Sequence, residues 1–456
     1  MQFGYPMESL WAANSKRLPI QMKKETLTYI SRSASSTFAV RCFYMAAGFA
    51  TTLLMTRWLG VEKIGVYNFV LSWVLTSVVL VKFGFEQYLV RELASNHLND
   101  RKSLWNLSFK FVAGTSAIVM GFIATSIPYL RFSNGEITTS LWLSLALIPL
   151  LALLGIYRAA FKSQQRIIES QVPEYMFRPS ILIISLLSFI WLGVQPDSGI
   201  AIVTNVAATS IVVAFCAFRS PTREWKKESN KTPRNLPSVI YATSPFILIA
   251  GIHIINQRTD RLMLGSIIDM ASVGTYSVAI QMATVVNFAI VGINAALSPV
   301  IATLGTETNR ANLQTTIWKV TNIASVIAIL ILLGLILFSP WALKLCGAGF
   351  ESSYYPLVIL GIGQLANVTF GPAAVLLSMM KHEKIVSACV ACSALINLVF
   401  NIALIPVYGT IGAAIATSLS MIILNLSLAI MAKRLTGVSS SQFFRSIPSC
   451  ARGNDE

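Results

Sequence analysis

The chain has 456 residues, of which 55% are hydrophobic and only 12% are charged, and its mean hydropathy is +0.66. Because a soluble protein carries about 25% charged residues, this composition excludes the ordinary soluble classes. The formal net charge of +16 does not indicate nucleic-acid binding, since the basic residues are scattered over short loops. We therefore expect a protein that crosses a membrane many times and has no nucleic-acid partner.

Apolar runs of about 20 residues, the length that crosses a bilayer core of about 30 Å, recur along the whole chain. They predict an all-α polytopic membrane protein with about 12 transmembrane helices. The expected spans are residues 35–56, 65–89, 107–128, 138–158, 177–195, 198–218, 237–257, 273–300, 315–338, 354–379, 385–405 and 410–432.

These spans divide the chain into two halves of equal helix number. We expect a cytosolic leader at 1–34, a first half at 35–218, a basic cytosolic linker at 219–236, a second half at 237–432 and a cytosolic tail at 433–456. The leader has no continuous apolar run with a cleavage site, so it is not interpreted as a signal peptide.

Lysine and arginine predict the orientation, because they are enriched in cytosolic loops. With the N-terminus in the cytosol, 27 of the 35 Lys and Arg residues fall on the cytosolic side and six on the other. Both termini are therefore expected to be cytosolic.

A pattern near the first turn of each half indicates an internal repeat. Both copies have Leu-Gly, a polar link and then Gly-x-Tyr at the start of the next span. The matched pairs are Leu59-Gly60 with Leu264-Gly265, and Gly65-x-Tyr67 with Gly274-x-Tyr276. Two halves with the same orientation imply a pseudo-two-fold axis along the membrane normal and a central cavity between the halves.

Glycine and proline mark the positions where tight turns or hinges are expected, since glycine gives the backbone conformational freedom. These positions are Gly60, Gly65, Gly265, Gly274, Pro406, Gly409 and Gly412.

Three stretches resemble one known family. The first hairpin is "RWLGVEKIGVYNF", the seventh span is followed by "DRLMLGSIIDMASVGTYSVA", and the last pair of spans contains "SALINLVFNIALIPVYGTIGAAIATSLS". The last stretch has the pattern N-x-x-x-N, IP-x-YG and GAA-x-AT. Its residues are Asn397, Asn401, Ile405, Pro406, Tyr408, Gly409, Gly412, Ala413, Ala414, Ala416 and Thr417.

The sequence thus resembles the lipid-linked oligosaccharide flippases, the Wzx-type O-antigen and polysaccharide translocases of the multidrug/oligosaccharidyl-lipid/polysaccharide exporter superfamily. The resemblance implies a substrate of undecaprenyl diphosphate bearing an oligosaccharide unit of O-antigen, capsule or exopolysaccharide. Such a protein moves its substrate from the inner to the outer leaflet of the bacterial inner membrane. Membrane lipids, a polysaccharide polymerase and chain-length machinery are the implied partners.

Charges inside the first two spans suggest where the anionic headgroup binds. Arg41 lies in span 1, and Lys82 lies in span 2 at a similar depth. Glu86 is four residues after Lys82 and can pair with it along the helix, which leaves Arg41 for a diphosphate. The alternative is that Arg41 extends its guanidinium back to the headgroup region.

Further charged residues lie at the ends of later spans. Arg178 opens span 5 as a cytosolic anchor or as a further headgroup contact. Arg258, Asp260 and Arg261 lie at the far end of span 7, where they form either a gate or exit site or an ion cluster that satisfies itself.

The sequence contains no catalytic constellation, metal cage or phosphate-binding Gly-Lys-Ser/Thr loop, so we expect a transporter and not an enzyme. No cofactor is expected, and Na⁺ or H⁺ is the candidate coupling ion. Two alternatives stay open: a cation-coupled multidrug antiporter of the same superfamily, and a membrane-embedded polysaccharide polymerase.

Overall fold

The computed structural model describes residues 20–94, 101–129, 135–220, 222, 236–288, 290, 310–441 and 443. Within these residues the chain is helical and has no strand. The elements of the first half are α2 (Ile20–Lys82), α3 (Phe85–Ala94), α4 (Arg101–Ser126), η1 (Ile127–Tyr129), α5 (Gly135–Ser144), α6 (Leu147–Ser163), α7 (Ile167–Val172), η2 (Pro173–Phe177), α8 (Arg178–Trp191) and α9 (Ser198–Arg219).

The second half begins with a long helix that the structure describes from residue 236. Its elements are α10 (Leu236–Ile267), α11 (Met270–Ala283), η4 (Thr284–Asn287), α13 (Arg310–Cys346), η6 (Phe350–Ser353), α14 (Tyr354–Thr369), α15 (Ala373–Met379) and α16 (Glu383–Thr436).

Long apolar helices confirm the expected all-α membrane architecture. In the described residues, eight segments are long and apolar enough to cross a membrane. Two of them, Ser36–Lys82 and Glu383–Thr436, are each interrupted by a glycine with non-helical dihedral angles. These glycines are Gly60, with φ of 76°, and Gly409, with φ of 55°. Both were expected turn positions, while the count of about 12 crossings stays a prediction.

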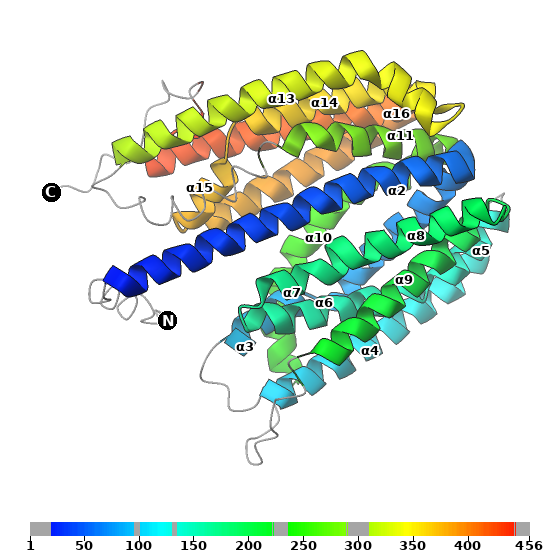
Figure 1. Ribbon diagram of the computed structural model, residues 1–456, viewed down its shortest axis with the longest axis horizontal. Helices are drawn as coiled ribbons and strands as arrows, with labels where there is room; N and C mark the ends of the chain where they lie inside the picture. Colours follow the sequence, from blue (N-terminus) through cyan, green and yellow to red (C-terminus); the bar gives the residue numbers. More distant parts are fainter. Residues whose placement is uncertain are drawn as a thin grey trace.

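The first part of α2 lies between two groups of helices (Figure 1). On one side it faces α4 to α9, and on the other side it faces α11 and α13 to α16, so the two groups correspond to the two halves of the sequence. The ribbons of the two groups approach each other at the end that contains Gly60 and diverge toward the other end. We call these the Gly60 end and the opposite end.

Side chains of the first hairpin donate hydrogen bonds to backbone carbonyl groups at the Gly60 end. Trp58 Nε1 donates to Val194 O at 3.2 Å, and Lys63 Nζ donates to Pro196 O at 2.7 Å. Arg57 Nε donates across to Leu345 O in the second half. The first hairpin therefore bonds to a loop of its own half and, through Arg57, to the end of α13 in the second half.

The repeated glycines bring the backbones of the two halves into close contact. A Cβ atom built at Gly65 would lie 1.7 Å from the backbone oxygen of Met270, and one at Gly274 would lie 2.2 Å from that of Val61. Neither backbone oxygen can rotate away as a side chain would. The first helix turn after each Leu-Gly motif thus packs directly on its counterpart in the other half, and only glycine fits at both positions.

A methyl group at Gly65 is therefore expected to force the halves apart at the Gly60 end. Overpacking of this kind costs about 1–3 kcal/mol, so Gly65→Ala should lower the midpoint of thermal unfolding of the protein in detergent. The matched control is Gly114→Ala, because nothing lies within 4 Å of a Cβ atom at Gly114. Equal midpoints for the two variants would show that the glycine contact does not hold the halves together.

Candidate functional site

The tyrosine of the first Gly-x-Tyr motif is part of a polar cluster that positions an arginine. Arg178 donates from Nε and Nη2 to Asn205 Oδ1, at 3.2 and 2.7 Å. Asn205, which is almost fully buried, donates from Nδ2 to the hydroxyl of Tyr67 at 2.8 Å. The cluster joins α8, α9 and the second part of α2, and it fixes one edge of the Arg178 guanidinium.

The tyrosine of the second motif binds a buried carboxylate instead. Asp260, on α10, is only 2% exposed. Its Oδ2 accepts from the hydroxyl of Tyr276 at 2.7 Å and from that of Thr417 at 2.6 Å, and its Oδ1 accepts from Asn401 Nδ2 at 2.7 Å. We call these four residues the Asp260 cluster. The Asn401 amide also donates to Asn397 Oδ1 at 3.0 Å, which extends the cluster along α16.

The sequence missed both networks. Sequence reasoning used Tyr67 and Tyr276 only to identify the repeat, and it assigned no role to Asn205. Asn397, Asn401 and Thr417 were noted for the family pattern without a role. The available signal was the presence of amide and hydroxyl side chains inside predicted spans, where each needs a hydrogen-bond partner.

The two arginines beside Asp260 do not pair with it. No salt bridge joins Arg258, Asp260 and Arg261 in the described residues, which does not favour the alternative of an ion cluster that satisfies itself. The Nε atoms of Arg258 and Arg261 are instead buried, and neither has a hydrogen-bond partner within the described part of the chain. Each is a donor without an acceptor.

A second arginine group lies between α6 and η2. Arg158 forms an ion pair with Glu174 and stacks over the ring of Tyr175 at 5.5 Å from its centroid. The Tyr175 ring in turn packs on Tyr44 of α2, with a centroid distance of 4.9 Å. Tyr44 is close enough to Arg178 and Arg258 to interact with both electrostatically. The face of α2 that contains Tyr44 is thus near arginines from both halves.

Lys82 is satisfied within the first half. Its Nζ pairs with Glu86 at 3.3 Å, as the four-residue spacing predicted, and Glu86 also pairs with Lys162 at 3.2 Å. Arg41 is exposed and forms no ion pair with the residues that the structure describes. The structure thus gives Lys82 a carboxylate partner and gives Arg41 none among the described residues.

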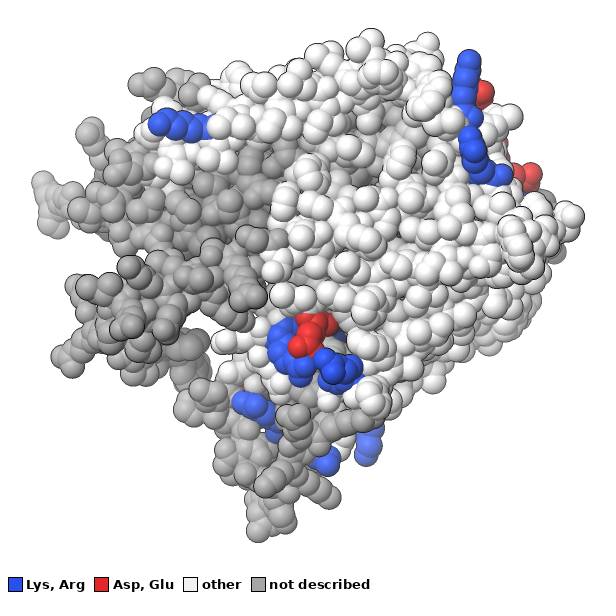
Figure 2. All heavy atoms as spheres, in the orientation of Figure 1, with Lys and Arg blue, Asp and Glu red and all other residues white. Residues whose placement is uncertain are grey.

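Among the described residues on the face of the molecule drawn in Figure 2, charged side chains are sparse and most atoms are white. Apart from the edges, the blue and red atoms gather in one patch in its lower part. Positive and negative side chains are mixed in that patch, so it is not a surface of one sign.

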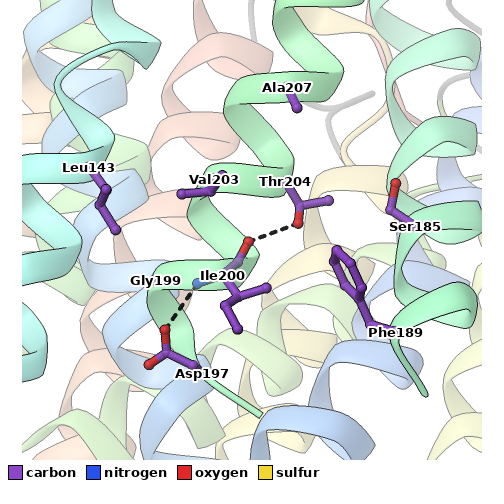
Figure 3. Close-up of a pocket in the computed structure, with 9 residues that line it drawn as sticks. All are labelled: Leu143, Ser185, Phe189, Asp197, Gly199, Ile200, Val203, Thr204 and Ala207. Carbon is purple, nitrogen blue, oxygen red and sulfur yellow. Dashed lines mark hydrogen bonds between the residues drawn. The ribbon is translucent and has the colours of Figure 1, made fainter. Parts of the chain in front are cut away.

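Figure 3 shows a pocket of about 360 Å³ between α5, α8 and α9 near the Gly60 end. Its acidic residue, Asp197, uses Oδ2 to accept from the backbone N–H of Ile200 at 3.1 Å and so caps α9. The Thr204 hydroxyl donates to Ile200 O at 2.8 Å. Because these polar groups are already bonded and the rest of the lining is mainly apolar, we do not assign the transport site here.

The family "Polysaccharide biosynthesis protein" matches residues 30–305. The chain belongs to this family. No curated protein matches the chain.

Solved transporters share the fold. The structure titled "Lipid II flippase MurJ, inward closed conformation" matches with a TM-score of 0.70 at 16% identity, covering 87% of each chain. An inward-facing multidrug resistance MATE family transporter of the MOP superfamily matches with a TM-score of 0.65 at 13% identity, over 87% of this chain and 94% of that one. A MOP superfamily transporter from Pyrococcus furiosus, described as having a binding pocket of reverse polarity, matches with a TM-score of 0.61 at 12% identity. The match covers 90% of this chain and 95% of that one. This family member therefore has the fold of MOP superfamily transporters.

The buried donors around Asp260 lead to a stability prediction. Asp260→Ala removes the acceptor that three buried hydrogen bonds share, and each donor that stays unpaired costs about 1–3 kcal/mol. Asp269→Ala is the matched control, because Asp269 only caps α11 from an exposed position, with one bond of 2.6 Å to Ser272 N. The midpoint of thermal unfolding should fall clearly further for Asp260→Ala. A similar fall in both variants would contradict the buried network.

Proposed function

We propose that this protein moves an undecaprenyl-diphosphate-linked oligosaccharide from the cytosolic to the outer leaflet of a bacterial inner membrane by alternating access. Membership of a polysaccharide biosynthesis family and the fold of membrane transporters support a transport function in this pathway. Our proposal that the substrate is anionic is based on the two buried Nε donors of Arg258 and Arg261.

Unsatisfied buried donors favour an anion. Leaving such a group unpaired costs about 1–3 kcal/mol, and more when the group is charged. A diphosphate has several oxygen acceptors, and a guanidinium can bind two of them at once. Arg178, held on one edge by Asn205, supplies a third guanidinium to the same interior. These three arginines are our proposed headgroup contacts, whereas Lys82 and Glu86 are proposed to stabilise the first half.

Two other functions fit these observations less well. A multidrug antiporter that exports organic cations needs carboxylates facing its substrate, yet the Asp260 carboxylate accepts three hydrogen bonds and is 2% exposed. A polymerase needs acid and base residues in a sizeable outer loop, and the sequence has only short loops on that side. We accordingly propose a transporter without catalytic residues.

The Asp260 cluster is our proposed place for the coupling ion. A carboxylate with neighbouring amide and hydroxyl oxygens offers the hard oxygen ligands that small cations take, and a proton on Asp260 would serve the same purpose. The cluster joins α10, α11 and α16, so loss or gain of the cation would change how these helices pack. We place the opposite end of the molecule in the cytosol and propose a polymerase and chain-length machinery as partners outside.

The headgroup assignment predicts a shared phenotype for three variants. In cells that lack the native gene, Arg178→Gln, Arg258→Gln or Arg261→Gln should reduce surface polysaccharide and strand lipid-linked units on the cytosolic face. Loss of one charge-assisted contact of about 1.5–3 kcal/mol corresponds to about 10- to 150-fold weaker binding. Arg91→Gln is the control, because the Arg91 side chain is 59% exposed. Normal polysaccharide in all three variants would refute the assignment, and export of unpolymerised units on deletion would indicate a polymerase.

Charge movement gives a prediction about energy. Moving a diphosphate of charge −2 outward through an inside-negative potential of about 100 mV releases about 4–5 kcal/mol. Flipping by the purified protein in vesicles should therefore accelerate when such a potential is imposed and slow when an ionophore collapses it. A rate that does not respond to the potential would exclude it as the driving force.

A further inference from the structure

An apolar groove runs between the first helix of the chain and the second half. It has a volume of about 520 Å³, within the range of about 300–1,000 Å³ typical of ligand sites. The residues that line it include Met45 and Phe49 on α2, Met282 on α11, Phe288 just after η4, and Leu335 and Phe338 on α13. Ser339 also lines it, but its hydroxyl already donates to Ile336 O at 3.1 Å.

Aromatic packing defines one end of this groove. Phe38 on α2 packs on Phe288, with a centroid distance of 5.6 Å. Along the groove, α2 and α11 approach closely at Gly48, where a Cβ atom would lie 3.2 Å from Gln281 Nε2. The groove therefore lies where the two halves meet, on helices that transport by alternating access would move relative to each other.

Arg41 lies on α2 next to this end of the groove. It precedes Cys42, a lining residue, and it lies one helical turn before both Tyr44 and Met45. Tyr44 faces Tyr175 and the arginines of the interior, whereas Met45 lines the groove. An exposed guanidinium without an ion pair in the described residues is thus placed between an apolar groove and a cationic interior.

We propose that this groove binds the isoprenoid chain of the substrate, with the diphosphate beside Arg41 before it passes to the interior arginines. The inference rests on the proposed function and adds where the lipid part lies. An apolar chain that ends in a diphosphate matches both the groove and the cation at its end. Bound in this way, the chain keeps its apolar surface out of the polar interior while the headgroup moves past Tyr44.

The experiment is photo-crosslinking in lipid nanodiscs with undecaprenyl diphosphate that carries a diazirine within its isoprenoid chain. Mass spectrometry should place most crosslinks on the groove residues Met45, Phe49, Met282 and Phe338. Excess unlabelled undecaprenyl diphosphate should remove them, whereas excess phosphatidylglycerol should not. A uniform distribution that includes Phe122 on the surface of α4, which is 73% exposed, would overturn the proposal, as would equal competition by phosphatidylglycerol.

Variants test the groove and the cation separately. Ala46→Trp, which fills the groove, should reduce the groove crosslinks about tenfold, the equivalent of ~1.4 kcal/mol. Gly121→Trp is the control, since Gly121 is exposed on α4 with nothing within 4 Å of its Cβ position. Arg41→Gln should weaken the crosslinks and Arg41→Lys should retain them. Unchanged crosslinks in both Ala46→Trp and Arg41→Gln would refute the site.

A transport assay separates the two possible failures. If wild-type protein flips the lipid-linked oligosaccharide and Ala46→Trp flips it equally well, the groove assignment fails while the proposed function holds. If wild-type protein does not flip it at all, the proposed function fails as well.

Discussion

The contact of each repeated glycine with a backbone oxygen of the other half is the constraint on which the rest of the structure depends. At Gly65 and Gly274 the backbones of the two halves approach so closely that no side chain fits. This contact holds the halves together at the Gly60 end, where Arg57 adds a hydrogen bond to the second half. The ribbons of the two halves then diverge toward the opposite end (Figure 1), and the interior arginines come from both of them. We propose that the two halves rock about the Gly60 end during transport.

The same repeat supports two different chemistries. In the first half the motif tyrosine, Tyr67, joins Asn205 and Arg178. In the second half its counterpart, Tyr276, joins Asp260 and Thr417. The tyrosines keep equivalent positions in the repeat, while the charge that each network holds has opposite sign. We propose that the two halves have different roles. Arg178 in the first half binds the anionic substrate, and Asp260 in the second half binds the coupling ion.

Local patterns in the sequence predicted what depends on neighbours along the chain. Apolar runs predicted the helices, the Leu-Gly motif predicted the turn at Gly60, and the four-residue spacing predicted the pair of Lys82 with Glu86. Residue spacing also disfavours an ion cluster of Arg258, Asp260 and Arg261, which was one of two alternatives from the sequence. Arg258 and Asp260 are two residues apart, and such residues do not face each other on a helix.

The partners of Asp260 were beyond the reach of sequence reasoning. They lie 16, 141 and 157 residues away along the chain, on helices whose packing no local pattern specifies. The hydrogen bond from Asn205 to Tyr67 joins residues 138 positions apart, and it could not be predicted from the sequence for the same reason. Sequence reasoning chose the site residues only because they are charged. The structure shows which of these charged side chains already have an ion-pair partner.

The central claim is that the substrate is a lipid diphosphate bearing sugars and not an organic cation. Its most direct test uses purified protein in vesicles that contain a fluorescent undecaprenyl-diphosphate-linked oligosaccharide in both leaflets, with an impermeant reagent that destroys the fluorophore from outside. We predict that vesicles with protein lose nearly all fluorescence, while protein-free vesicles keep about the half that faces inward. Retention of that half together with uptake or release of a lipophilic cation would contradict the claim and favour a multidrug antiporter.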